Sequence, residues 1–589
     1  MNPTKFIVVT GGVMSGVGKG IATASIGKIL QTYGFKVTAV KIDPYINLNA
    51  GTLRPTEHGE VWVTDDGGEI DQDLGNYERF LNVSLPKKNC MTTGQIYKTV
   101  IDKEIAGDYL GETVQFIPHI PNEIKQRVLA ASEGYDICLI EIGGTIGDYE
   151  NIPFLFAMKS LERERKGDLI YFLITYLPIP DHMPEMKTKP TQLAIKLLTE
   201  QGIIPDFILC RAREPLDEQR KRKIETYANI GADYVISAPD IKQTVYAVPL
   251  NFEKEKLGEK ILQKLHLQPK TIPDWRSWEA LVHRLEHPAK RIRIAMVCKY
   301  VDSGNYHIAD SYISVNESLK HAGAYLDAGL EITWLDAKDF ERHPENITLL
   351  DQFDGIVVPG GFGSSGVEGK IMAIHYAREH KIPFLGLCYG MQLATIEYAR
   401  HACGLAGAHT TEVDPRTPYP IIDMLPEQRS VKEKSGSMRL GAYGATLLEN
   451  SFVFDLYYRT GRLQRDQEHL SILRAQGQLF RLGKTPLHNM ILERHRHRYE
   501  QNPQFIRQLE QAGLVFSGYH EREDGTKLME FIELPRSQHP CFIATQSHPC
   551  FKSTLIDPSP LYVGFVAAAQ RTRELSPPQE EQTLQKKTT

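Results

Sequence analysis

A β-rich run, a glycine-rich loop and a helical stretch follow one another directly at the start of the chain. The run covers 5–10 and the loop covers 11–20. The N–H groups of such a loop and of the helix N-terminus can cradle phosphates, while Lys19 reaches the outer ones. The glycines are spaced one residue too far apart for the standard phosphate loop, and Gly20 replaces its Ser or Thr. The pattern predicts an α/β domain with a phosphate site; a glycine turn without function is the alternative.

Charged residues stand where two further strands of this domain end. Lys41 closes a strand over 36–42, and Glu141 closes a very apolar strand over 136–142. Asp73 lies in an acidic, loop-rich segment between them. A carboxylate at a strand end opposite a phosphate loop commonly holds Mg²⁺ beside a nucleotide. We therefore predict Asp73 and Glu141 as metal ligands, with solvated surface charges as the alternative.

Strands and helices continue to alternate, which predicts doubly wound parallel sheets in two α/β domains. A change to Pro and polar residues marks a linker. After it, strands are expected at 291–300, at 330–335, within 355–363 and at 383–388. The expected divisions are a first domain 1–267, a linker 268–290, a second domain 291–573 with an added surface segment near 454–489, and a disordered tail 574–589.

One cysteine stands at a glycine-flanked corner of the second domain. The run 383–392 reads as a short buried strand, a tight turn at Cys388 and a helix. A thiol at such a turn is a candidate nucleophile, and the amides of Gly360 and Gly361 could form an oxyanion hole. His548, at the end of a strand over 542–545, is a candidate general base. A buried structural cysteine is the alternative.

The composition excludes several classes of protein. Lys and Arg (68) nearly balance Asp and Glu (73), so nothing indicates a nucleic-acid partner or an anionic membrane. Eight cysteines without a CxxC pair argue against a disulfide framework and a structural zinc site. The chain starts without a signal-peptide pattern, and no apolar run reaches spanning length. We expect a soluble, cytoplasmic protein.

Five motifs in order resemble those of the CTP synthase family, over nearly the whole chain. They are 11–20 (GGVMSGVGKG), 41–47 (KIDPYIN), 141–148 (EIGGTIGD), 187–192 (KTKPTQ) and 494–500 (RHRHRYE). The resemblance implies an amidoligase (synthase) domain, P-loop-like in its fold, followed by a class I glutamine amidotransferase domain. It implies a ligase of pyrimidine biosynthesis in which ATP phosphorylates O4 of UTP and ammonia displaces the phosphate to give CTP.

The resemblance also implies a set of nucleotide contacts. Mg²⁺ would be bound by Asp73 and Glu141. Matching the ATP positions are Gly16, Val17, Gly18, Lys19, Gly20, Ile21, Lys41, Asp73, Pro239, Asp240 and Ile241. Matching the UTP and CTP positions are Ser15, Asp148, Tyr149, Glu150, Lys187, Thr188, Lys189, Pro190, Thr191, Gln192 and Lys223.

In the second domain the resemblance makes Cys388 the nucleophile that releases ammonia from glutamine, with His548 as its base. The glutamine positions are Gly361, Tyr389, Gly390, Met391, Gln392, Glu412 and Arg498. His58 matches a residue that lines the passage of ammonia. Activation by GTP, assembly into a homotetramer and polymerisation into filaments are further expectations from the resemblance.

The sequence departs from the family around the glutaminase site. Cys550 stands at the position of the triad Glu, so the carboxylate that orients the histidine is missing. Ser365 replaces an arginine associated with GTP activation, Ser547 an aromatic residue and Tyr389 the common leucine. The segment near 454–489 is also longer than usual. We predict a CTP synthase with weakened or altered glutamine use. The alternatives are full glutamine activity with His548 oriented by another group, and a nucleotide-binding, filament-forming regulatory relative without turnover.

Overall fold

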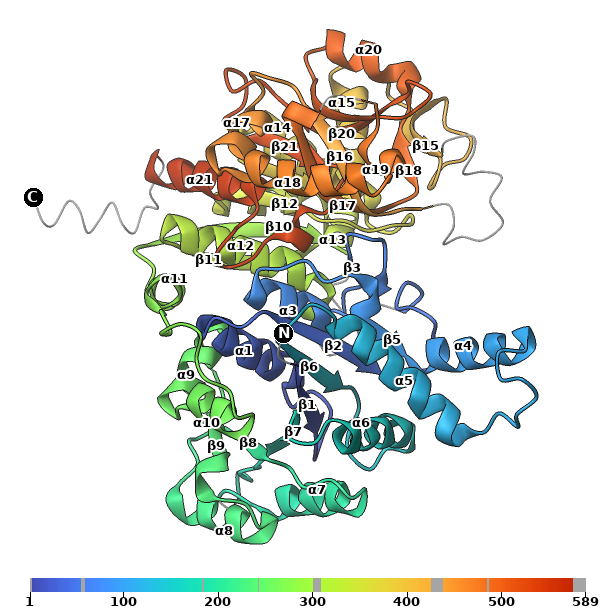
Figure 1. Cartoon of the computed structure of the whole chain (residues 1–589). Coiled ribbons are helices and arrows are strands. Elements are labelled where there is room, and N and C mark those ends of the chain that lie inside the picture. The colour runs from blue at the N-terminus through green and yellow to red at the C-terminus, as the bar shows by residue number, and fades with distance from the viewer. Residues whose placement is uncertain are drawn as a thin grey trace, which may run out of the picture. The chain divides into compact units, whose positions relative to one another are not determined.

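A computed structural model describes residues 3–53, 59–182, 185–241, 243–299, 309–424, 438–484 and 487–575. The chain divides into two compact units, each built on its own sheet (Figure 1). The first unit comprises Met1–Thr52 and Glu69–Val282, and the second comprises Leu53–Gly68 and His283–Thr589. The short segment 53–68 therefore interrupts the first unit in sequence but packs as part of the second.

The first unit contains a seven-stranded parallel sheet in the order β5-β2-β6-β1-β7-β8-β9. Its register places Lys41 of β2 beside Glu141 of β6. Its strands are β1 (Lys5–Gly11), β2 (Val37–Asp43), β5 (Cys90–Thr92), β6 (Ile137–Ile142), β7 (Leu169–Tyr176), β8 (Phe207–Ala212) and β9 (Val235–Pro239), with a short β4 (Glu69–Ile70) outside the sheet.

Helices cover both faces of this sheet because both faces of its strands are apolar. They are α1 (Lys19–Thr32), α3 (Asp73–Leu81), α4 (Thr93–Ala106), α5 (Phe116–Ser132), α6 (Ile152–Glu164), α7 (Lys189–Glu200), α8 (Glu218–Ala228), α9 (Val248–Lys254), α10 (Leu257–Lys264) and α11 (Arg276–Glu286). The division between the units falls within α11, inside the predicted linker.

The second unit contains a nine-stranded sheet in the order β11-β10-β12-β13-β21-β20-β19-β16-β17. The five strands from β11 to β21 are parallel, and the four beyond them are antiparallel. The prediction of parallel-sheet α/β domains is confirmed, and the antiparallel extension was not foreseen. The sheet strands are β10 (Lys290–Cys298), β11 (Ala328–Asp336), β12 (Gly355–Val358), β13 (Phe384–Leu387), β16 (Arg439–Leu447), β17 (Met490–His497), β19 (Val515–Glu521), β20 (Lys527–Glu533) and β21 (Phe542–Thr545).

A smaller sheet joins β14 (Ala408–Thr410), β15 (Tyr419–Met424) and β18 (Tyr499–Gln501), and β3 (Trp62–Val63) lies in the segment 53–68. The helices of this unit are α12 (Ile313–Leu326), α13 (Ala337–Arg342), α14 (Val367–Glu379), α15 (Tyr389–His401), α17 (Phe452–Arg459), α18 (Arg462–Ala475), α19 (Leu479–Leu482), α20 (Pro503–Gln511) and α21 (Pro560–Leu575).

The segment near 454–489 differs from the surface addition that the sequence predicts. It folds into α17, α18 and α19, and Leu470 of α18 and Leu482 of α19 are buried with Ala442 of β16 and Leu492 of β17. Arg462 and Asp466 form a buried ion pair, with 2.9 Å between Nε and Oδ1. Apolar side chains at helical spacing thus anchor this segment to the antiparallel part of the sheet.

Among the described residues, no helix has the length and apolar character needed to cross a bilayer. Of the predicted tail, Glu574 ends up in α21, whereas 576–589 lie outside the described residues.

Candidate active sites

A buried cluster of charged side chains lies at the carboxyl edge of the first sheet. The Lys41 ammonium bonds a carboxylate oxygen of Asp73, and its Nζ lies 3.0 Å from Oε1 of Glu141. Tyr77 of α3 donates from its hydroxyl to the other Glu141 oxygen at 2.5 Å. The two predicted metal ligands therefore lie together, joined through a predicted ATP contact. The positions of Asp73 and Glu141 along the chain did not by themselves predict that the two carboxylates lie close together.

Two further carboxylates, Asp43 and Asp71, belong to the same cluster and are absent from the predicted set. Oδ1 of Asp43 lies 3.7 Å from the Lys41 ammonium. Burial, reinforced by neighbouring carboxylates, raises the pKa of both Asp43 and Asp71. Against burial, the Lys41 ammonium lowers the pKa of Asp73. An excess of buried carboxylate oxygens over local cations fits a site for a hard divalent ion.

The glycine loop places Lys19 at the first residue of α1, as the sequence predicts. Its Nζ donates to the carbonyl oxygen of Gly144 at 2.6 Å, and burial lowers the pKa of the ammonium. Gly18, before the helix, has φ 85°, a left-handed conformation that disfavours other residues. The loop therefore turns Lys19 toward the end of the strand that carries Glu141. An anion bound there would be stabilised by the Lys19 ammonium and by the N-terminus of α1.

Arg211, at the end of β8, links the loop to the predicted adenine segment. Its guanidinium donates to the carbonyl oxygen of Val17 at 3.2 Å and pairs with Asp240 at 2.5 Å. Pro239 ends β9, so 239–241 begins at the carboxyl edge of the same sheet. Arg211 was missed because a lone arginine at a strand end carries no sequence signal.

The predicted UTP and CTP contacts lie in four places. Ser15 belongs to the glycine loop, the segment 187–192 leads into the N-terminus of α7, and Lys223 lies on α8. The side chain of Asp148 accepts a hydrogen bond from the N–H of Thr145 at 2.7 Å, in the turn after β6. The predicted ammonia-passage residue His58 lies outside the described residues.

In the second unit, Cys388 occupies the sharp turn between β13 and α15. Its φ of 50° is unusual for a residue with a side chain and is typical of a nucleophile held at a strand-to-helix corner. A methyl group on Gly390 would lie 2.1 Å from the carbonyl oxygen of Val358, so only glycine fits there. Burial raises the pKa of the Cys388 thiol to about 12. The thiol therefore needs a base to remove its proton.

The loop that follows β12 lies against this thiol. A methyl group on Gly360 would lie 3.7 Å from Cβ of Cys388 and 3.3 Å from Cε1 of His548. The buried Lys370 of α14 donates from Nζ to the carbonyl oxygen of Pro359 at 3.3 Å, and this hydrogen bond helps to hold the loop in place. Burial lowers the pKa of Lys370 to about 7. This lysine was not predicted, because within a helical stretch it reads as an ordinary surface charge.

Three of the predicted glutamine contacts, Tyr389, Gln392 and Glu412, make hydrogen bonds near the nucleophile. Gln392 donates from Nε2 to Oε1 of Gln546 at 3.2 Å, and Gln546 donates to the Cys388 sulfur at 3.7 Å. Glu412 accepts the N–H of Gly363 at 2.8 Å, and the Tyr389 hydroxyl donates to the Gly363 carbonyl oxygen at 3.2 Å. The remaining residues of the set, Gly361, Met391 and Arg498, lie on the loop after β12, in α15 and between β17 and β18, respectively.

His548 is held without a carboxylate. In the described part of the chain no acidic side chain pairs with it, and its Nε2 is buried without a hydrogen-bond partner. The backbone N–H of His548 donates to the Arg494 carbonyl oxygen at 2.7 Å, and its ring stacks on Phe551 with centroids 5.2 Å apart and planes 13° apart. Burial lowers the pKa of His548 to about 3. The imidazole is therefore neutral at pH 7, and its low pKa makes it a weak acceptor for the Cys388 proton.

The Phe551 ring packs in turn against Trp62 of the segment 53–68, with centroids 5.0 Å apart. Arg494 fixes this segment, since its Nε lies 2.6 Å from Oδ1 of Asp65 and its guanidinium lies 5.4 Å from the centre of the Trp62 ring. Cys550 is buried close by, with Tyr562 against its thiol. Among the described residues, aromatic rings and not a carboxylate therefore border the histidine.

Comparisons with known proteins give matches over both parts of the chain. Residues 5–267 match the family model described as "CTP synthase N-terminus", and residues 307–568 match "Glutamine amidotransferase class-I". The CTP synthase of Thermococcus gammatolerans is 47% identical over 97% of this chain and 99% of its own length. That of Methanopyrus kandleri is 48% identical over 96% and 99%, respectively.

One solved structure among the similar ones is a Trypanosoma brucei CTPS glutaminase domain with bound acivicin. It is 32% identical, covers 48% of this chain and 94% of its own, and has a TM-score of 0.39.

Proposed function

The chain belongs to the CTP synthase family, and from this premise we propose how its residues divide the reaction. It is a glutamine-hydrolysing ligase that binds nucleotides and glutamine and aminates UTP to CTP at the expense of ATP. We assign the phosphoryl transfer and amination to the Lys41 cluster of the first unit, and the release of ammonia to Cys388 of the second. The non-catalytic regulatory alternative is not favoured, because Lys19, Lys41, Asp73 and Glu141 are all present and close together.

In the first unit, Lys19 and the N–H groups of the loop 11–20 would hold the ATP phosphates. Lys41 would offset charge on the phosphoryl group as it passes from ATP to O4 of UTP. The buried carboxylates fit Mg²⁺, with Asp73 and Glu141 as ligands and Asp43 and Asp71 close enough to assist. When bound, the ion would supply positive charge next to the transferring phosphate.

The remaining nucleotide contacts complete this proposal. Residues 239–241 would contact adenine, and Arg211 would hold that segment against the phosphate loop. The uracil nucleotide would meet Ser15, the segment 187–192 and Lys223. Residues 148–150 would recognise CTP as a product.

In the second unit, the Cys388 thiol would transfer its proton to His548 and attack the side-chain amide of glutamine. Ammonia leaves with a proton returned by the imidazole, and water hydrolyses the resulting thioester. The amides of Gly360 and Gly361 would stabilise the oxyanion. Glu412 would bind the α-amino group of glutamine and Arg498 its carboxylate.

We infer further that glutamine use is weak relative to ammonia use. The observation that carries this is that no carboxylate among the described residues pairs with His548, while Cys550 stands at the position of the triad Glu. A triad acid fixes the tautomer of its histidine and stabilises the imidazolium. Here stacking on Phe551 can fix the ring plane, but it supplies no negative charge for the imidazolium.

The test is CTP formation from ATP, UTP and Mg²⁺ with either ammonium or glutamine as nitrogen source, with and without GTP. We expect strong turnover with ammonium and at least about tenfold weaker turnover with glutamine. Equal, strong rates would refute the inference while leaving the synthase activity established. Because Ser365 replaces the arginine linked to GTP, we also expect a small response to GTP as activator.

A homotetramer, filaments and a cytoplasmic location stay proposals that rest on the family alone. Sedimentation of the purified protein with and without nucleotides would test the assembly.

A further inference from the structure

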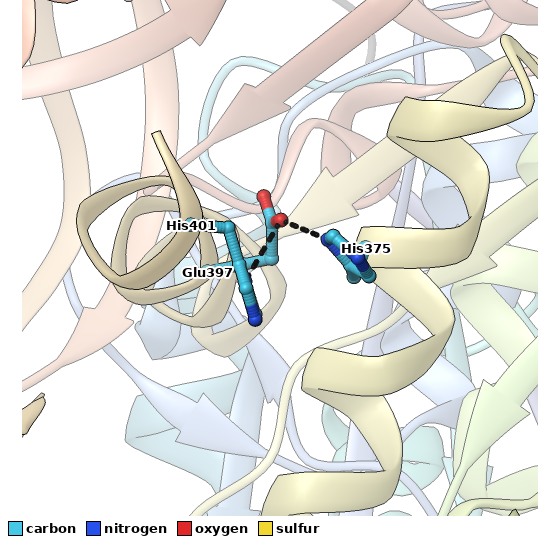
Figure 2. A group of neighbouring side chains, drawn as sticks. All are labelled: His375, Glu397 and His401. Carbon is cyan, nitrogen blue, oxygen red and sulfur yellow. Dashed lines mark hydrogen bonds and ion pairs between the residues drawn. The ribbon is translucent and has the colours of Figure 1, made fainter. Parts of the chain in front are cut away.

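A second group of chemically competent side chains lies in the glutaminase unit, away from Cys388. His375 comes from α14, while Glu397 and His401 come from α15, four residues apart on one face of the helix. Oε1 of Glu397 lies 2.8 Å from Nδ1 of His375 and 3.3 Å from Nδ1 of His401 (Figure 2). All three ligand atoms lie within 4.8 Å of one another.

From this geometry we propose that His375, Glu397 and His401 form a binding site for a zinc-like divalent cation. Two imidazole nitrogens and one carboxylate oxygen are a ligand set that Zn²⁺ favours. With bonds of about 2.1 Å, tetrahedral ligand atoms lie about 3.4 Å apart, so shifts of side chains alone would close the site. The fourth position would be taken by water, because both histidines are about two-fifths exposed (40% and 41%).

Glu397 is the centre of the cluster. Its side chain is fully buried, and both imidazoles and the Arg378 guanidinium have a nitrogen within 3.3 Å of its carboxylate oxygens.

Arg378 is the competing partner in this cluster. Its guanidinium contacts both oxygens of Glu397, with Nε 3.0 Å from Oε2 and Nη2 2.9 Å from Oε1. This pair already ties α14 to α15, so the two histidines are not needed for that purpose. A cation would share Oε1 with Arg378, which predicts moderate affinity.

The site is remote from the reaction. Glu397 lies nine residues beyond Cys388 on α15, about 13 Å along the helix axis. A bound cation would clamp α14 to α15 without touching the substrate. Both helices begin at the glutaminase centre, so the clamp would stabilise that centre rather than take part in its chemistry.

The test is titration of the full-length, chelator-treated protein with Zn²⁺ by calorimetry, and with Co²⁺ by its visible absorption. We expect one equivalent whose dissociation constant rises at least about tenfold in the double variant His375→Ala, His401→Ala. His380→Ala, which removes the exposed histidine that follows α14 and lies outside the cluster, is the matched control and should leave this equivalent unchanged. Ammonium-dependent CTP synthesis, expected to be unchanged, reports that each variant is folded.

Cysteine thiols also bind Zn²⁺, so the deciding quantity is the difference between wild type and the double variant. Identical titrations of the two would overturn the proposal. A second variant, Arg378→Gln, removes the competing cation and should tighten binding about threefold. Unchanged or weaker binding in that folded variant would also count against a metal at Glu397.

Discussion

Restoring the missing acid by Cys550→Glu tests the reasoning about His548 most directly. In serine triads the loss of the acid lowers kcat about 10⁴-fold, equivalent to about 5.5 kcal/mol of transition-state stabilisation. A cysteine thiol is intrinsically more nucleophilic and depends less on its base. We therefore expect glutamine-dependent kcat/KM to rise between about 10-fold and 10³-fold.

The surroundings of Cys550 set the cost of this change. The residue is 1% exposed, Tyr562 lies against its thiol, and Ser318 donates to its carbonyl oxygen at 3.4 Å. A larger side chain in such packing costs about 1–3 kcal/mol of stability. The variant should thus melt at a lower temperature and still use glutamine better. Cys550→Gln, which has the size of Glu without the charge, is the matched control. It should lose stability in the same way without any rise in glutamine-dependent kcat/KM.

The assay follows CTP formation at varied glutamine, with ammonium-dependent synthesis as the internal reference. The pH profile gives an independent readout. Because burial lowers the pKa of His548 to about 3, the acid limb of the wild-type glutamine profile should lie far below neutrality. A carboxylate at 550 stabilises the imidazolium and should move that limb upward. If the folded Cys550→Glu variant shows neither a gain nor a shifted limb, His548 is already fully oriented and the reasoning is wrong.

Three further outcomes follow from the same contacts. Lys41→Met leaves Asp73 and Glu141 without their ammonium, so CTP formation should fall at least about 100-fold with both nitrogen sources; a loss confined to glutamine would contradict this. Trp62→Leu removes the ring behind Phe551 and should lower glutamine use about tenfold with ammonium use intact, whereas Trp62→Phe should be mild; equal losses with both nitrogen sources would argue for general unfolding. Because the pKa of His548 lies below its unfolded value of about 6.5, the fold loses stability as pH falls from 6.5 toward 3, by about 2 kcal/mol at pH 5. In urea unfolding, the free energy of unfolding of His548→Gln should therefore fall less between pH 7 and 5 than that of wild type. An equal fall in the two proteins would show that other groups dominate.

Local order in the sequence was enough to predict the two α/β frameworks and the elements that carry Lys19, Glu141 and Cys388. Each of these residues sits at the junction of a strand and a turn, where periodicity changes and glycines mark the corner. Residues that reach a site from another part of the chain were harder to predict from the sequence. Asp71 joins Lys41 only because the start of α3 folds beside the strand end, whereas Asp43 lies two residues after Lys41 on β2 and so on the same side of that strand, a local signal that the prediction did not use.

The same limit explains the other differences. Glu397 and His401 are four residues apart on an expected helix, but their partner His375 lies on a separate helix, and nothing in the sequence pairs the two helices. The antiparallel strands β16 and β17 are separated by a long segment, so no hairpin signal revealed them. β19 and β20 form a hairpin across 522–526, and its Asp524-Gly525 pair is a turn signal that the prediction did not use. Helical spacing within 454–489 was hidden by many Arg and Gln residues, although Leu470 and Leu482 anchor it in the core.

The segment 53–68 changes how the departure at Cys550 should be understood. Its sequence lies within the half of the chain that forms the synthase unit, yet Trp62 and Asp65 pack in the glutaminase unit behind Phe551 and Arg494. In a triad with an acid, a charged hydrogen bond orients the histidine. Without one, we expect the His548 ring to be oriented by Phe551, which stacks on it and packs in turn edge-on against Trp62. It follows that the geometry of the base is tied to a segment whose two ends both enter the synthase unit.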